Sequence, residues 1–193
     1  TELVDQKVNY LLSNAIEFKT EDEKLAMRLE DYVTDEFQAV IKDLVEGASI
    51  KSYEALYFYY DDANKLCLEV ADSFNLIFIT DDWGEVTQVI RHYITYFYDD
   101  KGNRVPKHRI ELYDDTMVYY FVKADSKDGK YIQDKEAKYH RADDVDGTII
   151  GREDSQIPFL ILKNNNRMLN DLNPIKSLID DYDLMAGSLS NNL

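Results

Sequence analysis

Hydrophobic side chains at the start of the chain recur at steps of three and four residues, which is the spacing of one face of a helix. Val8 and Leu11 belong to such a stripe within residues 3–14 and predict a short helix there. Ile16 and Phe18 then alternate with charged residues, so the pattern predicts a short strand directly after that helix.

A second stripe of the same period predicts one long helix from about residue 21 to residue 46. Its members are Leu25, Leu29, Val33, Phe37, Val40, Ile41 and Leu44. Thr20 and Glu23 are spaced as a capping box, in which each side chain bonds a free N–H group at the start of a helix. Gly47 suits the end of the helix, because glycine adopts positive φ at no steric cost. We expect this helix to pack on a sheet, with Phe37 among its most buried residues.

Between residues 49 and 163 the hydrophobic period changes to two, which is typical of strands. The alternation predicts six or seven strands in an antiparallel meander, at residues 53–59, 66–70, 76–79, 85–98, 110–112, 118–122 and 157–162. Asp99–Asn103 contains the glycine of a hairpin loop, and Pro158 indicates that the last strand lies at an edge. Residues 133–151 are charged and poorly patterned, and we expect a mobile loop or a weak edge hairpin there.

A helical pattern returns near the end of the chain. Asn173 can cap this helix, and Pro174 suits its first position. The apolar face holds Ile175, Leu178, Ile179, Tyr182, Met185 and Leu189. The other side of the helix carries Asp180, Asp181 and Asp183.

The order of these elements predicts an α+β fold, with a long N-terminal helix on a mainly antiparallel sheet and a C-terminal helix. We expect a single domain over residues 1–193, helical over 1–47, β-rich over 48–163 and helical again over 170–193. The chain opens without an initiating methionine, and its helical pattern runs to the last residues. We therefore expect it to be a piece of a longer protein.

The composition is that of a chain that can bury a core, with 45% apolar and 31% charged residues. Its formal net charge of −16 argues against tight binding to a phosphate backbone, which depends on lysine and arginine. The single cysteine, Cys67, excludes an internal disulfide and multi-cysteine metal sites. No apolar run approaches the length of a membrane-spanning helix, so we expect no membrane partner.

Residue types that carry chemistry are present but not in catalytic patterns. His92, His108 and His140 lack metal-ligand spacing, and we interpret them as ordinary sheet or surface residues. Six pairs of adjacent aspartates begin at Asp61, Asp81, Asp99, Asp114, Asp143 and Asp180. Four of these pairs fall in expected turns, where aspartate bonds nearby backbone N–H groups. We predict no catalytic, cofactor-binding or metal-binding residue and no cofactor.

Two other function classes stay open at this point. An acidic metal-dependent hydrolase would need carboxylates from several aspartate pairs to converge on one ion. A protein-interaction module would use the 15 tyrosines, which bury area while keeping a polar tip in water.

Several ordered segments resemble the portal proteins of siphophage-type tailed bacteriophages of Gram-positive hosts. Val8–Thr20 resembles the family's opening stretch, with Ala15 where proline is usual, and Gly47–Glu54 resembles the glycine-led turn that follows. Phe78–Asp82 is similar to the family's aspartate pair before a strand. The most recognisable passage begins at Ile157-Pro158-Phe159, continues through Lys163-Asn164-Asn165 and ends with Leu172–Asp183. The resemblance covers nearly the whole chain except residues 123–151.

The resemblance implies a non-enzymatic, structural role in the wing domain of the portal. Such portals assemble as rings, typically dodecamers, at one capsid vertex of the virion, after synthesis in the host cytoplasm. The ring is the conduit through which DNA passes during packaging and ejection, without sequence-specific binding. Its implied partners are the terminase, the capsid or scaffolding proteins and the head-completion proteins. The family's stem and clip lie after this segment, so we expect this chain alone to be a monomer or weak dimer.

Overall fold

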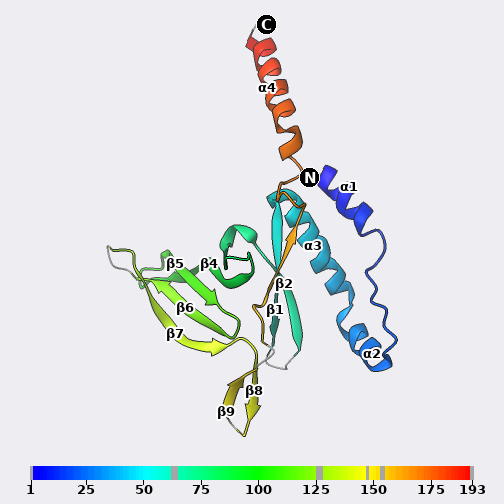
Figure 1. Ribbon diagram of the computed structural model, residues 1–193. Helices are drawn as coiled ribbons and strands as arrows, with labels where there is room; N and C mark the ends of the chain where they lie inside the picture. Colours follow the sequence, from blue (N-terminus) through cyan, green and yellow to red (C-terminus); the bar gives the residue numbers. More distant parts are fainter. Residues whose placement is uncertain (1, 62–64, 125–127, 147, 153–154, 192–193) are drawn as a thin grey trace. The chain divides into compact units, whose positions relative to one another are not determined.

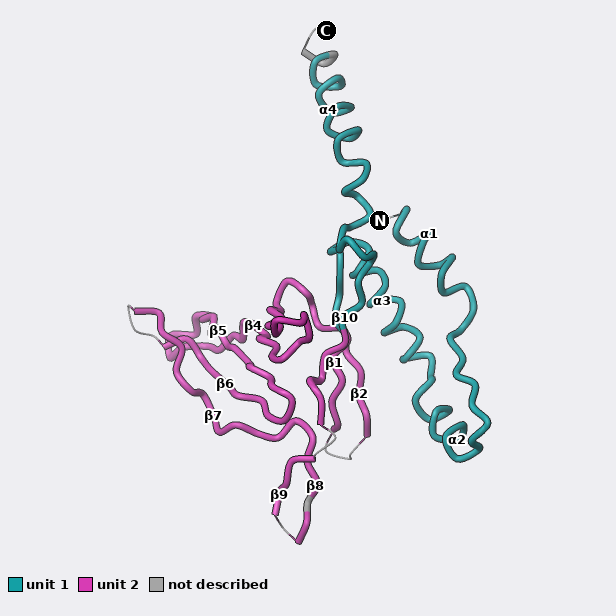
Figure 2. Tube along the Cα trace, in the orientation of Figure 1, with its two compact units in different colours: residues 1–55, 161–193 teal, residues 56–160 magenta. Residues whose placement is uncertain are grey.

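The computed structural model describes residues 2–61, 65–124, 128–146, 148–152 and 155–191, without the side chains of Asp144 and residues 189–191. The chain divides into two compact units (Figure 2). Unit 1 contains residues 1–55 and 161–193, and unit 2 contains residues 56–160. Each unit is described separately below.

Helices make up most of unit 1 (Figure 1). They are α1 (Glu2–Leu11), α2 (Glu23–Tyr32), α3 (Asp35–Lys51), the 3-10 turn η2 (Asn173–Ile175) and α4 (Lys176–Asn191). The first and last of these confirm the helices expected at the two ends of the chain. α1 lies against α3, and its Val8 is buried.

The single long helix predicted over residues 21–46 is wrong, because the chain breaks between α2 and α3. Thr34 has an extended backbone, and its hydroxyl accepts a hydrogen bond from the Phe37 N–H group. A threonine in this role starts a new helix. Since Phe37 then lies in the first turn of α3, it is only half-buried, and the fully buried hydrophobic residues of this helix are Leu44 and Ala48. The expected burial of Phe37 is therefore wrong as well.

The start of α2 differs from the expected capping box. Asp22, not Thr20, is the cap, and its carboxylate accepts hydrogen bonds from the Lys24 and Leu25 N–H groups. The Thr20 hydroxyl instead accepts a hydrogen bond from the Asp22 N–H group. An aspartate is at least as good a cap as threonine, so the helix begins two residues later than the box would place it.

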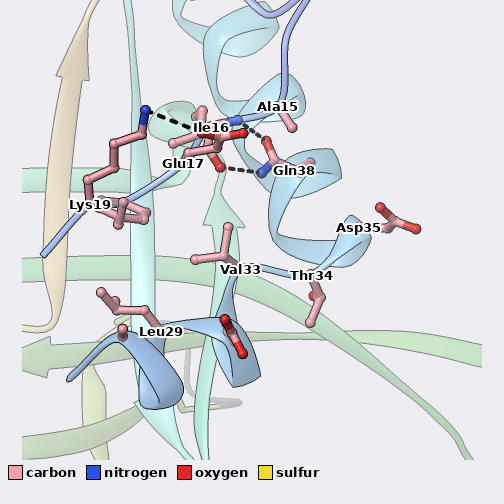
Figure 3. A pocket seen from close by; sticks show the side chains of 12 residues that line it. Ala15, Ile16, Glu17, Lys19, Leu29, Val33, Thr34, Asp35 and Gln38 are labelled. Atoms are coloured by element: carbon pink, nitrogen blue, oxygen red, sulfur yellow. Dashed lines mark hydrogen bonds and ion pairs between the residues drawn. The ribbon is translucent and has the colours of Figure 1, made fainter. Parts of the chain in front are cut away.

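The strand predicted at Ile16–Phe18 does not form. The side-chain amide of Gln38, on α3, accepts a hydrogen bond from the Ile16 N–H group and donates one to the Ile16 carbonyl, both at 3.0 Å (Figure 3). A glutamine side chain thus provides both bonds that a neighbouring strand would have made. This segment borders a cleft of about 420 Å³ between residues 15–19 and 26–38.

Gly47 does not end a helix as predicted, because α3 continues to Lys51. A Cβ atom at Gly47 would overlap the Glu54 carboxylate, which is 1% exposed and forms an ion pair with Lys51. The glycine is required for this close approach. Ser52, with φ of 85°, ends the helix instead.

Asn173 is not the cap of the last helix. It starts the 3-10 turn that precedes α4, and Leu172 stands before it with no capping side-chain bond. Pro174 lies in the first turn, as expected for a residue without an N–H group.

The strands form a three-stranded sheet, a five-stranded sheet and a hairpin. Their bounds are β1 (Tyr53–Tyr60), β2 (Leu66–Ala71), β3 (Leu76–Thr80), β4 (Val86–Tyr98), β5 (Arg104–Tyr113), β6 (Met117–Lys123), β7 (Tyr131–Tyr139), β8 (Ala142–Val145), β9 (Thr148–Gly151) and β10 (Phe159–Lys163). The sheet orders are β10-β1-β2 and β3-β4-β5-β6-β7. The α+β class is confirmed, and the antiparallel meander has five strands rather than six or seven. β10 is an edge strand, as predicted.

We predicted a loop or an edge hairpin at residues 133–151. The loop prediction is wrong for the first part of this segment, which forms strand β7 beside β6. Cross-strand partners support its charged residues. Lys135 Nζ lies 3.6 Å from the centroid of the Tyr120 ring, and Asp134 forms an ion pair with Arg109. The sequence shows no apolar alternation over β7 because polar and charged side chains make the cross-strand contacts there. The second part is the antiparallel hairpin β8–β9, as the hairpin alternative predicted.

The register of the five-stranded sheet separates a buried face from a second face. Val89, Tyr113 and Val118 oppose one another on β4, β5 and β6, and all three are buried. Residues one position along each strand, such as Ile90 and Leu112, point to the other face, since side chains alternate along a strand. The core of unit 2 therefore lies on the Tyr113 side of this sheet.

Candidate functional site

The aspartate pairs lie in turns and bond the backbone there. The carboxylates of Asp81, Asp99 and Asp114 each accept two backbone N–H bonds, from residues two to four positions ahead. The turn interpretation of these three pairs is confirmed. Their carboxylates are committed to local structure, which opposes a shared metal-binding role.

Of the remaining pairs, two are brought together, because Asp61 and Asp143 line one pocket of unit 2 with His140. Asp143 forms an ion pair with Arg152, and Asp180 pairs with Lys176 along α4. Asp61 accepts the Lys65 N–H bond; its neighbour Asp62 and the side chain of Asp144 lie outside the described residues. Within the described part of the chain, no three His, Cys, Asp or Glu side chains gather as a metal site would need.

The three histidines have different environments, and two of them meet. The rings of His92 and His108 stack, with centroids 5.4 Å apart, and His92 Nε2 lies 3.2 Å from His108 Nδ1. They come from β4 and β5, offset by two positions in the register. His140 is part-buried, and its Nε2 lies 3.0 Å from the Asp114 carbonyl oxygen. Burial lowers the pKa of His140, although its contacts with Asp114 act in the opposite direction.

A cluster of tyrosines around one carboxylate lies on the buried face of the five-stranded sheet. The Tyr93 and Tyr113 hydroxyls donate to the two oxygens of Glu111, at 2.9 and 2.8 Å. Tyr57 and Phe159 pack on Tyr113 with ring centroids at 5.8 and 5.0 Å. This tyrosine cluster is a satisfied polar network within an aromatic core. It takes up Tyr57, Tyr93 and Tyr113, three of the 15 tyrosines to which the interaction-module hypothesis appealed.

The tyrosine cluster raises the pKa of its buried hydroxyl groups. Burial, aided by the Glu111 carboxylate, raises the pKa of Tyr93 to about 12. Burial also raises the pKa of Tyr113, together with the nearby Tyr57 and Glu111. Both hydroxyls are held neutral, as donors to the carboxylate.

We expect the free energy of unfolding to fall as the pH rises from about 10 to about 12. The unfolded chain loses its tyrosine protons near pH 10, whereas folded Tyr93 keeps its proton to about pH 12. The unfolded state then binds fewer protons, so stability decreases with pH in this window. Urea unfolding at several pH values measures the slope, which should be shallower in Tyr93→Phe. The matched control, Tyr98→Phe, removes an exposed tyrosine and should keep the parent slope; equal slopes in all three chains would contradict the prediction.

A second polar cluster in unit 1 was missed by sequence reasoning. Lys7 Nζ donates to Asn164 Oδ1 at 2.6 Å and to Asp171 at 2.9 Å. Asn164 Nδ2 donates to Asp171 Oδ1 and to the Leu169 carbonyl. Burial opposes the shift, but the bonds from Asn164 and Lys7 lower the pKa of Asp171 below its ordinary value. The cluster joins α1 to the segment before α4.

The neighbouring asparagine organises the same loop. Asn165 accepts hydrogen bonds from the Arg167 and Leu169 N–H groups and donates one to the Leu169 carbonyl. Asn164 and Asn165 were singled out by the resemblance only. Their place in the structure shows that they shape the loop at residues 164–171 and hold no ligand-like arrangement.

Comparison with known proteins gives two findings. The chain is similar to the portal protein of Bacillus phage SPP1, with 27% identity over 192 residues, which is 96% of this chain and 36% of the relative. It therefore spans about a third of the length of that relative. Among the described residues, no helix has the length and apolar character needed to cross a bilayer. The second finding is a family model that matches residues 1–193, and the chain belongs to that family, the phage portal proteins of the SPP1 Gp6-like type.

Proposed function

We propose that this chain is the wing part of a subunit in a bacteriophage portal ring, with a structural and not an enzymatic role. The observation that carries the proposal is the match of the family model to every residue of the chain. The order of the elements, from α1 through the meander to α4, supports treating residues 1–193 as one portal segment. The turn bonding of the aspartates supports the absence of a hydrolase centre.

The ring would stand at the portal vertex of the virion and conduct DNA during packaging and ejection. Its partners would be the terminase, the capsid or scaffolding proteins and the head-completion proteins, met first in the host cytoplasm. A net charge of −16 suits a wall that does not grip DNA, because like charges repel. This repulsion supports passage of the DNA without tight binding, and we propose that no base-specific contacts are made.

The full-length subunit is expected to assemble into closed rings, whereas the 193-residue chain alone stays a monomer or weak dimer. A ring repeats one head-to-tail contact, and the stem and clip implied by the family resemblance would add to it. Negative-stain electron microscopy of the full-length subunit tests for rings, with mass determination by light scattering. A full-length subunit that remains monomeric at high concentration would overturn the proposed function.

A further inference from the structure

One face of the five-stranded sheet in unit 2 is apolar and open to solvent. We call it the open face; on strands β3–β6 its apolar members include Ile77, Ile90, Ile94, Ile110, Leu112 and Phe121. Ile77 on the edge strand is 60% exposed, and Ile94 on the second strand is 41% exposed. Contiguous exposed apolar residues of this kind mark interaction surfaces.

Strands β3–β6 give the open face a charge opposite to that of the chain as a whole. The chain has 38 aspartates and glutamates, yet these four strands contain a single one, Glu111. The edge strand β7 adds Glu136 and Asp134, of which Asp134 pairs with Arg109. Glu111 points to the buried face, where it bonds the tyrosine cluster. The open face carries Arg104, Lys123 and the histidine pair instead. It therefore suits an apolar partner with acidic flanks.

Helix α4 in unit 1 has this chemistry. Its apolar stripe includes Leu178 and Tyr182, each 68% exposed, with Ile179 and Met185 also exposed. Leu189 continues the stripe in sequence, but its side chain lies outside the described residues. Asp180, Asp181 and Asp183 lie outside this stripe, as the 3.6-residue period requires.

The dimensions of the two surfaces also agree. The 16 residues of α4 rise about 24 Å at about 1.5 Å per residue. Five strands at a spacing of about 4.8 Å span about 19 Å across the sheet. One helix can therefore cross the open face from edge to edge.

We propose that α4 of one copy of this chain docks on the open face of a second copy. Pairing two open faces would bring Arg104 and Lys123 toward their own copies, and pairing two α4 helices would do the same to their aspartates. Of the three pairings, only α4 on the open face places apolar side chains against apolar side chains and acidic side chains near basic ones. The contact is head-to-tail, and it rests on the proposed ring, since such contacts repeat around closed rings.

A complementation experiment tests the contact on the 193-residue chain. Ile94→Glu places a carboxylate on the open face, and Leu178→Lys places a cation on the stripe of α4. Both positions are exposed, so each variant is expected to keep the melting temperature of the parent. Each variant alone should self-associate at least tenfold more weakly than the parent in sedimentation velocity runs.

Mixing the two variants should restore association to within about threefold of the parent, because the intact α4 of one can dock on the intact open face of the other. The matched controls are Ile149→Glu on the hairpin β8–β9, and Leu184→Lys on the opposite side of α4; both should associate as the parent does. Ile149 is 59% exposed and Leu184 is 73% exposed, so each control position is at least as exposed as its test position.

Three results would overturn the contact. An unchanged Ile94→Glu variant would mean that association does not use the open face, and a mixture that fails to recover would mean that the two surfaces do not meet. A parent chain that stays monomeric to millimolar concentration would show that no such contact forms between copies. Rings of the full-length subunit would still form in each case if only this contact is wrong, which separates its failure from that of the proposed function.

Discussion

Replacing Tyr113 with alanine is expected to destabilise unit 2 by about 3–5 kcal/mol, the range for removing a large buried aromatic side chain. Tyr113 is 3% exposed and lies between Val89 and Val118 in the register of the sheet. Its ring also packs on Tyr57 and Phe159. In a chain of this size, the loss corresponds to a fall in melting temperature of roughly 6–20 °C. Thermal unfolding followed by circular dichroism measures it.

Tyr113→Phe is the matched control, since it keeps the ring and removes only the hydroxyl. The hydroxyl donates to Glu111 Oε2 at 2.8 Å, and a hydrogen bond to a charged group contributes about 1.5–3 kcal/mol. We expect the phenylalanine variant to be less destabilised than the alanine variant. Equal losses in the two variants would place the stabilisation in the hydroxyl, against the packing argument.

Replacing Leu44 with alanine is expected to destabilise unit 1 by about 2–5 kcal/mol, because truncating a buried leucine leaves a cavity. Leu44 is 5% exposed and belongs to the buried side of α3, together with Ala48. Urea unfolding, with the midpoint and slope measured separately, gives the change in free energy.

Phe37→Ala on the same helix is the matched control. Phe37 is half-buried and contacts Phe18, with ring centroids 6.1 Å apart. Phe18 itself is 54% exposed, so the pair buries little area and the expected loss is about 1 kcal/mol. A larger loss at Phe37 than at Leu44 would restore the sequence-based expectation and contradict the burial seen here.

Two features of unit 1 explain in physical terms why residues of the resembling motifs are present. Asn164 and Asp171 hold Lys7, which brings together residues more than 150 positions apart in the sequence. Gly47 leaves room for the buried carboxylate of Glu54. Both features are contacts within unit 1, so these motif positions contribute to its folding.

The sequence alone determined the elements whose period is long and regular. Strands β4 and β6 and helices α1 and α4 were predicted close to their observed bounds, because alternation and the 3.6-residue stripe are local properties of the chain. The turns at Asp81, Asp99 and Asp114 were predictable for the same reason, since an aspartate bonds N–H groups only a few residues ahead. The α+β class followed from the order of these elements, and the family resemblance followed from the residues of several ordered motifs.

The tertiary structure decided the features that depend on distant partners. Gln38 takes the place of a strand beside Ile16, and Thr34 divides one apolar stripe into two helices. The register brings His92 to His108 and sets Glu111 against two tyrosines, which no spacing along the chain reveals. It also leaves one face of strands β3–β6 without a carboxylate. Hydrophobic period identifies which residues share a face, but only the pairing of strands determines which face is covered and which stays open.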